Sequence, residues 1–237
     1  DNAGIVKFDE NWNFALKAET HNSPSALDPY GGAITGIVGV NRDVLGAGLG
    51  CRCIFNTDVF CFATPFFDGD IPARLMHPRR VLRGVHQGVK DGGNQSGIPN
   101  LNGAIVFHER FLGKPLVFCG TGGLIPATIN GKPRHEKCAK PGDLIVMCGG
   151  RIGKDGIHGA TFSSEELHEG SPATAVQIGD AITQKKMADF LLEARDRGLF
   201  SNITDNGAGG LSSSIGEMAK GSGGAVIHLD RAPLKYP

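Results

Sequence analysis

The chain has 237 residues with 24 basic and 24 acidic side chains, so no overall charge attracts it to nucleic acid or to a membrane surface. No apolar run reaches the roughly 18 residues of a spanning helix, and we expect neither nucleic acid nor membrane as a partner. The length suits one large domain or two of ordinary size. The 36 glycines are scattered among apolar segments, which indicates loops built from backbone.

The six cysteines predict free thiols. Cys51-Arg52-Cys53 lacks the two-residue spacer and the second pair of a zinc site, while Cys119 and Cys148 lie within apolar runs. A reduced thiol packs there like a small apolar side chain, as is typical of a cytoplasmic protein. The chain does not begin with Met and has no signal peptide, so we expect a piece of a longer protein.

The first predicted strand spans residues 14–20. Side chains alternate between the faces of a strand, so Lys17, Glu19 and His21 share one face. Residues 22–24 predict a turn. A cation, a carboxylate and an imidazole at alternate positions can bind phosphate and metal, although charged side chains also occupy strand faces that only meet solvent.

The next segment, residues 31–46, is apolar and rich in glycine. Gly32 and Gly36 would give a helix a flat face for close packing, yet glycine costs a helix about 1 kcal/mol at each site. The pattern leaves helix and loop open. Arg42 and Asp43 repeat the combination of a cation for phosphate and a carboxylate for metal.

Further elements follow from apolar periodicity and from breaker residues. The expected elements are strands at 54–63, 104–107, 116–119, 144–148 and 225–229, helices from Pro78 to Gly92, at 187–194 and at 211–218, and a polar loop at 92–99. Glycine, proline and charge accumulate between residues 122 and 141, which predicts a domain boundary there. The glycine loop at 149–156 does not fit the P-loop pattern, because Asp155 stands where Ser or Thr would hold Mg²⁺.

Asp205 precedes a glycine-rich stretch, residues 207–210, and a helix from about Leu211. Backbone N–H groups at a helix N-terminus bind anions, and a carboxylate ahead of them can hold a phosphate through Mg²⁺. A helix capped by Asp or Asn is the alternative. Together with Glu19 and Asp43, Asp205 would supply three carboxylates, about what two Mg²⁺ ions on a triphosphate need.

Five stretches of the sequence resemble the formylglycinamide ribonucleotide amidotransferases, also called phosphoribosylformylglycinamidine synthases, in their separate-subunit form. They are residues 17–22, 36–43, 149–164, 176–180 and 205–210. In that family ATP phosphorylates the amide oxygen of formylglycinamide ribonucleotide, and ammonia displaces the phosphate to leave the amidine. The resemblance thus implies a ligase of purine biosynthesis that uses ATP and Mg²⁺.

The resemblance also implies a role for each matching residue. Lys17 would contact ATP; Glu19, Asp43 and Asp205 would hold Mg²⁺; His21 would accept a proton; and Thr20, His21, Asn22, Ser23, Arg42 and Gln177 would contact the substrate. Many members of the family have a second His at the position of Ser23. A glutaminase subunit would supply ammonia, with a small bridging subunit as a further partner. The family's upstream catalytic segment is not in the chain, so we expect the isolated piece to be inactive.

The fold implied by the resemblance is α/β followed by α+β, of the aminoimidazole ribonucleotide synthetase type. An N-terminal domain at 1–127, with strands at a barrel-like interface, and a C-terminal domain at 128–237 would both be truncated, with the nucleotide between them. Related ATP-using enzymes such as aminoimidazole ribonucleotide synthetase, selenophosphate synthetase and thiamine-phosphate kinase remain alternatives, although residues 19–22 and Gln177 favour the amidotransferase. A non-catalytic scaffold half is a further alternative, which the intact set of carboxylates disfavours. Zero net charge disfavours a glycine-rich RNA-binding domain.

Overall fold

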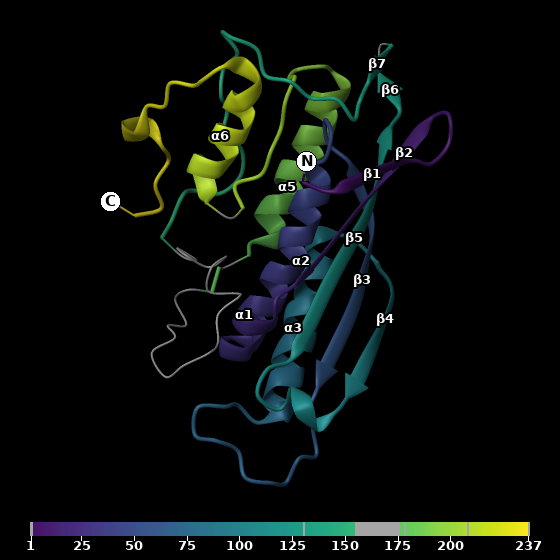
Figure 1. The fold of residues 1–237 in the computed structure, drawn as a ribbon, viewed down its shortest axis with the longest axis vertical. Coiled ribbons are helices and arrows are strands. Elements are labelled where there is room, and N and C mark those ends of the chain that lie inside the picture. The colour runs from purple at the N-terminus through teal and green to yellow at the C-terminus, as the bar shows by residue number, and fades with distance from the viewer. Residues whose placement is uncertain (1, 130, 155–175, 178, 208, 237) are drawn as a thin grey trace.

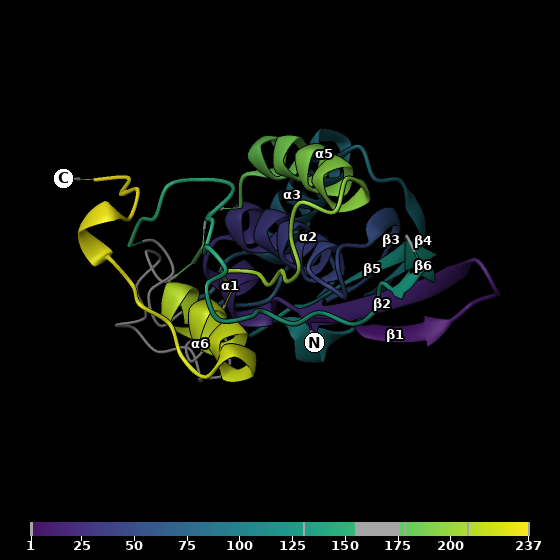
Figure 2. The ribbon, with the colours of Figure 1, turned by 90° about the horizontal axis from the view of Figure 1, so that it is seen from above.

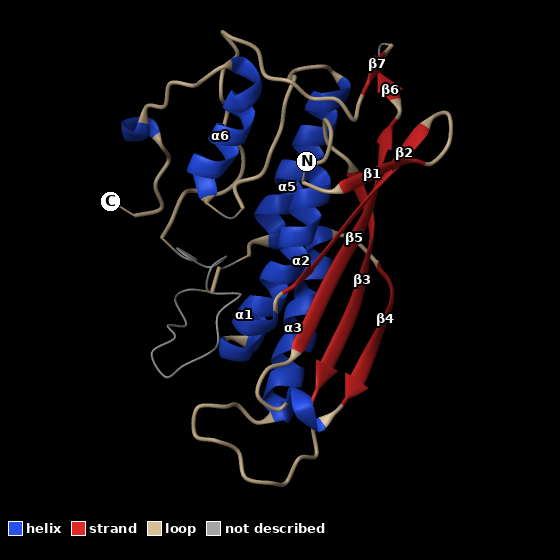
Figure 3. Ribbon diagram, viewed as in Figure 1, coloured by secondary structure: helices blue, strands red, loops and turns tan. Residues whose placement is uncertain are grey.

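A five-stranded sheet forms the frame of the first half of the molecule (Figures 1 and 3). In spatial order its strands are β1 (Gly4–Lys7), β2 (Trp12–Thr20), β5 (Leu116–Pro126), β3 (Arg52–Phe62) and β4 (Asn100–Phe107). Neighbouring strands are antiparallel except β3 and β4, which are parallel. The computed structural model describes residues 2–129, 131–154, 176–177, 179–207 and 209–236.

Helices cover one face of this sheet. They are α1 (Asn22–Leu27), α2 (Pro29–Leu45) and α3 (Pro78–Ser96), and a short 3-10 helix, η1 (Glu109–Phe111), follows β4. The later helix α5 (Ala181–Asp196) contacts α2 and α3, and Figure 2 shows α2 between the sheet and α5. The main hydrophobic core lies between the sheet and the first helices and includes Ile37, Phe62, Val85 and Val117.

The alternation predicted for residues 14–20 is confirmed in β2. Asn13 and Ala15 are buried, whereas Leu16 is 47% exposed on the opposite face. Lys17 and Glu19 share the face of Ala15, since they follow it at alternate positions. The charged side chains of this strand therefore lie on the side of the sheet that the helices cover.

The glycine-rich segment that left helix and loop open is helical. Pro29 lies in the first turn of α2, and the side chain of Asp28 accepts a 3.1 Å hydrogen bond from the Gly31 N–H, a typical helix start. A Cβ at Gly32 would lie 2.4 Å from the backbone nitrogen of Ser25. Glycine at this position therefore lets the backbones of α1 and α2 contact each other directly, and this close packing offsets the low helix propensity of glycine.

The helix predicted to end at Gly92 is longer than expected. It continues as α3 to Ser96, and Gly97 ends it in the left-handed conformation at φ 67°. Gly92 stays inside the helix because it packs against Ile37, where a Cβ would approach to 3.2 Å. The polar loop expected from residue 92 therefore begins only after α3.

The turn expected over residues 22–24 is wrong, because these residues begin α1. Pro24 fits the first turn of a helix, where its missing N–H is not needed. The side-chain oxygen of Asn22 accepts a 2.8 Å hydrogen bond from the Val117 N–H, and the His21 N–H donates a 2.8 Å bond to the Val117 carbonyl. The chain is thus fixed to β5 at the point where the helix starts.

The second half contains helices and extended chain. Its elements are β6 (Thr128–Ile129), β7 (Lys132–Pro133), α5, α6 (Gly210–Ser222) and the 3-10 helix η3 (Leu229–Arg231). The helices predicted at 187–194 and 211–218 are confirmed as parts of α5 and α6, and the strands predicted at 54–63, 104–107 and 116–119 as parts of β3, β4 and β5. No helix in the described part of the chain is long and apolar enough to cross a lipid bilayer.

The strands predicted at residues 144–148 and 225–229 are wrong. Neither segment pairs with another strand among the described residues. Leu144 is 89% exposed and Val226 is 81% exposed. A strand needs a neighbour for its backbone hydrogen bonds, so an apolar, β-prone sequence alone does not make one.

Candidate functional site

The end of β2 places charged side chains against α2. The Lys17 Nζ lies 3.0 Å from Glu19 Oε1 and 3.1 Å from Asp43 Oδ2. The His21 Nε2 lies 3.4 Å from Glu19 Oε2. Lys17 thus joins the strand to the helix, and two segments predicted separately from the sequence meet at one place.

Gly36 on α2 makes this approach possible. A Cβ at Gly36 would lie 3.0 Å from the Cys119 Sγ and 3.3 Å from the His21 Cγ. At Gly39 it would lie 3.9 Å from His21 Nε2 and 4.0 Å from Glu19 Oε2. The contacts at Gly39 are ordinary van der Waals distances, so it is the glycine at position 36 that lets the backbone of α2 lie beside the imidazole.

A third segment reaches the same place from the second half of the chain. The Arg42 Nε donates a 2.6 Å hydrogen bond to Asp205 Oδ2. The N-cap of α6 is Gly209, with φ 82° and no side-chain capping bond. Asp205 is therefore not the cap of this helix, and its carboxylate faces α2.

Three carboxylates, those of Glu19, Asp43 and Asp205, lie around the cations Lys17 and Arg42. Burial and the nearby Asp205 raise the pKa of Asp43, whereas the hydrogen bond from His21, together with Lys17, lowers the pKa of Glu19. Burial lowers the pKa of Lys17, but its hydrogen bonds to Glu19 and Asp43 outweigh that effect and raise it. Three carboxylates facing two fixed cations would be stabilised by an added cation.

The carboxylate oxygens are of the kind that Mg²⁺ prefers, but they do not form a closed cage. Among the described residues, no group of three His, Cys, Asp or Glu side chains is arranged to hold a metal ion by itself. Mg²⁺ is commonly bound by one or two carboxylates together with waters and substrate phosphates. The carboxylates here fit that open mode of binding.

A cleft of about 990 Å³ brings most of the predicted residues together. They are Lys17, Glu19, Thr20, His21, Arg42, Asp43, Gln177 and Asp205. Asn22 and Ser23 do not line it: the Asn22 side chain is bonded to β5, and Ser23 is fully buried. The backbone carbonyl of Gln177 accepts a 2.7 Å hydrogen bond from Thr35 Oγ1, which fixes this residue beside α2.

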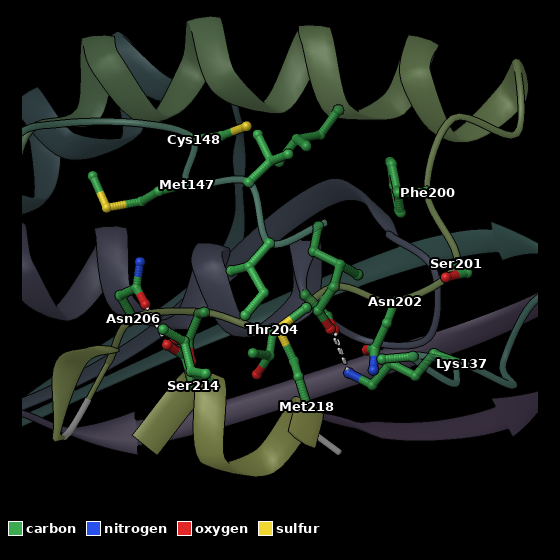
Figure 4. Close-up of a pocket in the computed structure, with 18 of the residues that line it drawn as sticks. Lys137, Met147, Cys148, Phe200, Ser201, Asn202, Thr204, Asn206, Ser214 and Met218 are labelled. Atoms are coloured by element: carbon green, nitrogen blue, oxygen red, sulfur yellow. Dashed lines mark hydrogen bonds between the residues drawn. The ribbon is translucent and has the colours of Figure 1, made fainter. Parts of the chain in front are cut away.

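Sequence reasoning missed Lys137, Thr204 and Glu217, which also line the cleft. Lys137 lies in the stretch expected to be a boundary, and no motif marks it. A larger cavity of about 3060 Å³ lies between α5 and α6 and adjoins the cleft (Figure 4). Met147 and Phe200 are among the residues that line this cavity. Most of the predicted stretch at 149–164 lies outside the described residues, as do positions 178 and 208.

Family comparisons agree with this architecture. The AIR synthase related protein N-terminal domain matches residues 1–125, and the C-terminal domain of the same family matches residues 140–237. The chain belongs to the AIR synthase related protein family. The fold expected from the sequence, α/β followed by α+β with both parts truncated, is thereby confirmed.

Curated relatives of this AIR synthase related chain include the phosphoribosylformylglycinamidine synthase subunits PurL of Picrophilus torridus and Thermotoga maritima. The first is 39% identical over 238 residues, which are 99% of this chain and 31% of that protein. The second is 38% identical over 239 residues, which are 100% of this chain and 36% of that protein. The chain thus spans about a third of the length of these relatives, and the resemblance seen in the sequence is confirmed.

Solved structures show the same relationship. The T. maritima PurL complexed with FGAR matches this AIR synthase related chain with a TM-score of 0.82 and 34% identity, over 100% of this chain and 36% of that one. The T. maritima PurL complexed with ATP matches with a TM-score of 0.77 and 31% identity, over 99% of this chain and 34% of that one. A HypE-HypF complex matches at 17% identity with a TM-score of 0.65, which shows likeness of fold alone.

Proposed function

We propose that this chain is an internal part of the synthetase subunit of a phosphoribosylformylglycinamidine synthase. The protein that contains it would convert formylglycinamide ribonucleotide, ATP and ammonia to the amidine, ADP and phosphate. The observation that carries the proposal is the meeting of Lys17, Glu19, Asp43 and Asp205 in one cleft, from three segments of the chain. The PurL relatives support it.

The proposed roles follow from the charges. Lys17 would bind the phosphates of ATP, and Arg42 would release Asp205 in part to bind the anionic substrate together with Thr20 and Gln177. The carboxylates of Glu19, Asp43 and Asp205 would hold Mg²⁺, which neutralises charge on a transferring phosphoryl group. Roles for Asn22 and Ser23 in substrate binding would require main-chain contacts or a rearrangement, because neither lines the cleft.

His21 is proposed as the proton acceptor. Its Nδ1 is buried with no hydrogen-bond partner among the described residues, and its Nε2 faces Glu19. For this role the neutral ring would carry its hydrogen on the buried Nδ1 and take the proton from the attacking nitrogen on Nε2, where the Glu19 carboxylate would accept a hydrogen bond from the imidazolium. Gly36 sets the position of the ring by direct packing.

Partners and location are proposed from the relatives. A solved T. maritima structure of PurLQS is 33% identical to this chain with a TM-score of 0.75. We propose that ammonia comes from a glutaminase subunit, that a small bridging subunit takes part, and that the complex is cytoplasmic. We also propose a division into partial domains at residues 1–127 and 128–237.

The test uses the full-length protein that contains this chain. ADP formation is followed with Mg-ATP and ammonium, and with either formylglycinamide ribonucleotide or its amidine product. Turnover that requires the amide and ammonium, and that Glu19→Gln abolishes, supports the proposal. Turnover with the amidine alone points to aminoimidazole ribonucleotide synthetase, and no turnover with either refutes the proposal.

A further inference from the structure

Lys137 joins two segments that are far apart in the sequence. Its Nζ donates hydrogen bonds to the carbonyls of Gly46 and Ile203, each at 2.9 Å. Figure 4 shows the Lys137 side chain lying along the wall of the cavity, with a dashed hydrogen bond to a backbone carbonyl. Gly46 is the C-cap of α2, and Ile203 lies two residues before Asp205.

The physical setting suits a cation at this point. The last carbonyls of a helix have no partner within the helix, and its C-terminal end carries partial negative charge. The ammonium satisfies one such carbonyl at the end of α2. Burial lowers the pKa of Lys137, and the carboxylates of Glu217 and Asp205 offset part of that effect.

Further hydrogen bonds also hold residues 201–205 in place. The Cys138 N–H donates a 3.1 Å hydrogen bond to the Ser201 carbonyl, and Thr204 Oγ1 donates a 3.4 Å bond to the Asn2 side chain. The Arg42 contact holds the Asp205 carboxylate itself. Lys137 differs from these because it ties the main chain before Asp205 directly to the end of α2, the helix that carries Asp43.

We propose that Lys137 is a positioning residue that keeps the Asp205 carboxylate opposite Asp43. The link fixes the distance between the end of α2 and the segment at 203–205, so the two carboxylates stay near each other. This role deepens the proposed function and rests on it, because both carboxylates are proposed there to hold Mg²⁺. Lys137 itself touches neither substrate nor metal in this proposal.

The test compares three variants of the full-length protein. Lys137→Met removes both hydrogen bonds, Lys137→Arg keeps a cation with several N–H donors, and Lys140→Met removes an exposed charge three residues away. Hydrogen–deuterium exchange of a peptide covering residues 201–207 is measured without metal or nucleotide. The Mg²⁺ concentration for half-maximal turnover is measured separately.

We expect Lys137→Met to exchange about tenfold faster at residues 201–207 and to need about tenfold more Mg²⁺, as the loss of hydrogen bonds from a charged donor implies. Lys137→Arg should restore both values to within about threefold, and Lys140→Met should leave both unchanged. If Lys137→Met does not fold, Lys137→Gln, which loses the charge and keeps a polar head, replaces it.

Unchanged exchange in Lys137→Met overturns the inference. Faster exchange with an unchanged Mg²⁺ requirement also overturns it, because the link would then be purely structural. An unmodified protein without turnover would contradict the proposed function instead. In that case the exchange experiment and binding of Mn²⁺, measured by electron paramagnetic resonance, still decide whether Lys137 positions a metal-binding carboxylate.

Discussion

Asp58 is a buried carboxyl group that should make the stability of the chain depend on pH. It is 2% exposed, accepts a hydrogen bond from Asn100 Nδ2 and lies beside the Cys119 thiol, and its Oδ1 has no partner among the described residues. Burial raises the pKa of Asp58 from 3.8 to about 7. Asp58→Asn replaces it with a neutral group of the same shape.

The sign and size of the effect follow from linkage. Below pH 3.8 both the folded and the unfolded chain hold the proton, and stability is full. Between pH 3.8 and about 7 only the folded chain holds it, so the free energy of unfolding falls as pH rises. The shift in the pKa of Asp58 lowers the free energy of unfolding by at most about 4 kcal/mol by pH 8. Asp58→Asn has no proton to lose at this position, so its free energy of unfolding does not fall for this reason.

The assay is urea unfolding of the chain from pH 4 to pH 8. Asp58→Asn should match the parent chain near pH 4 and exceed its unfolding free energy by about 2 to 4 kcal/mol at pH 8. Asp70→Asn, which removes an exposed carboxylate, should follow the parent at every pH. Parallel curves for Asp58→Asn and the parent would refute the reasoning.

The other predictions concern the glycines, thiols and carboxylates. Gly36→Ala should lower turnover of the full-length protein tenfold or more, because its Cβ would lie 3.0 Å from the Cys119 Sγ. A Cβ at Gly39 meets only ordinary contacts, so turnover of Gly39→Ala in the same kinetic assay should stay within about threefold of the unmodified protein. Maleimide should label exposed Cys138 in the native chain and buried Cys119 only in urea, and mass spectrometry checks this. Asp205→Asn should raise the Mg²⁺ requirement about tenfold without changing the melting temperature; a variant that unfolds would make Asp205 a structural residue.

Much of the fold could be predicted because its signals are local. Alternation along β2 follows from the two-residue period of a strand, and the stripes of α5 and α6 follow from the helical period. Residues 144–148 and 225–229 show the limit of such signals. Their apolar, β-prone sequences predict strands, but a strand also depends on a distant partner that a local pattern does not specify.

The candidate site was only partly accessible to sequence reasoning. The charged residues on β2 and α2 were found because their types and spacing are informative. The ion pair between Lys17 and Asp43 depends on how α2 packs against the sheet, and a local sequence pattern does not specify that packing. Lys137 was missed because its hydrogen-bond partners are backbone carbonyls. Every residue has a backbone carbonyl, so the types of the partner residues do not reveal the contact.

The contact between Arg42 and Asp205 has a consequence for how the protein is made. A ribosome releases the N-terminus first, and the sheet can be completed once β5, which ends at Pro126, has emerged. Asp205 follows roughly 80 residues later, about 4 to 16 s at common rates of translation. Over that interval the nascent chain carries Arg42 without its carboxylate partner, so the face of α2 that later meets Asp205 has one negative charge fewer beside it.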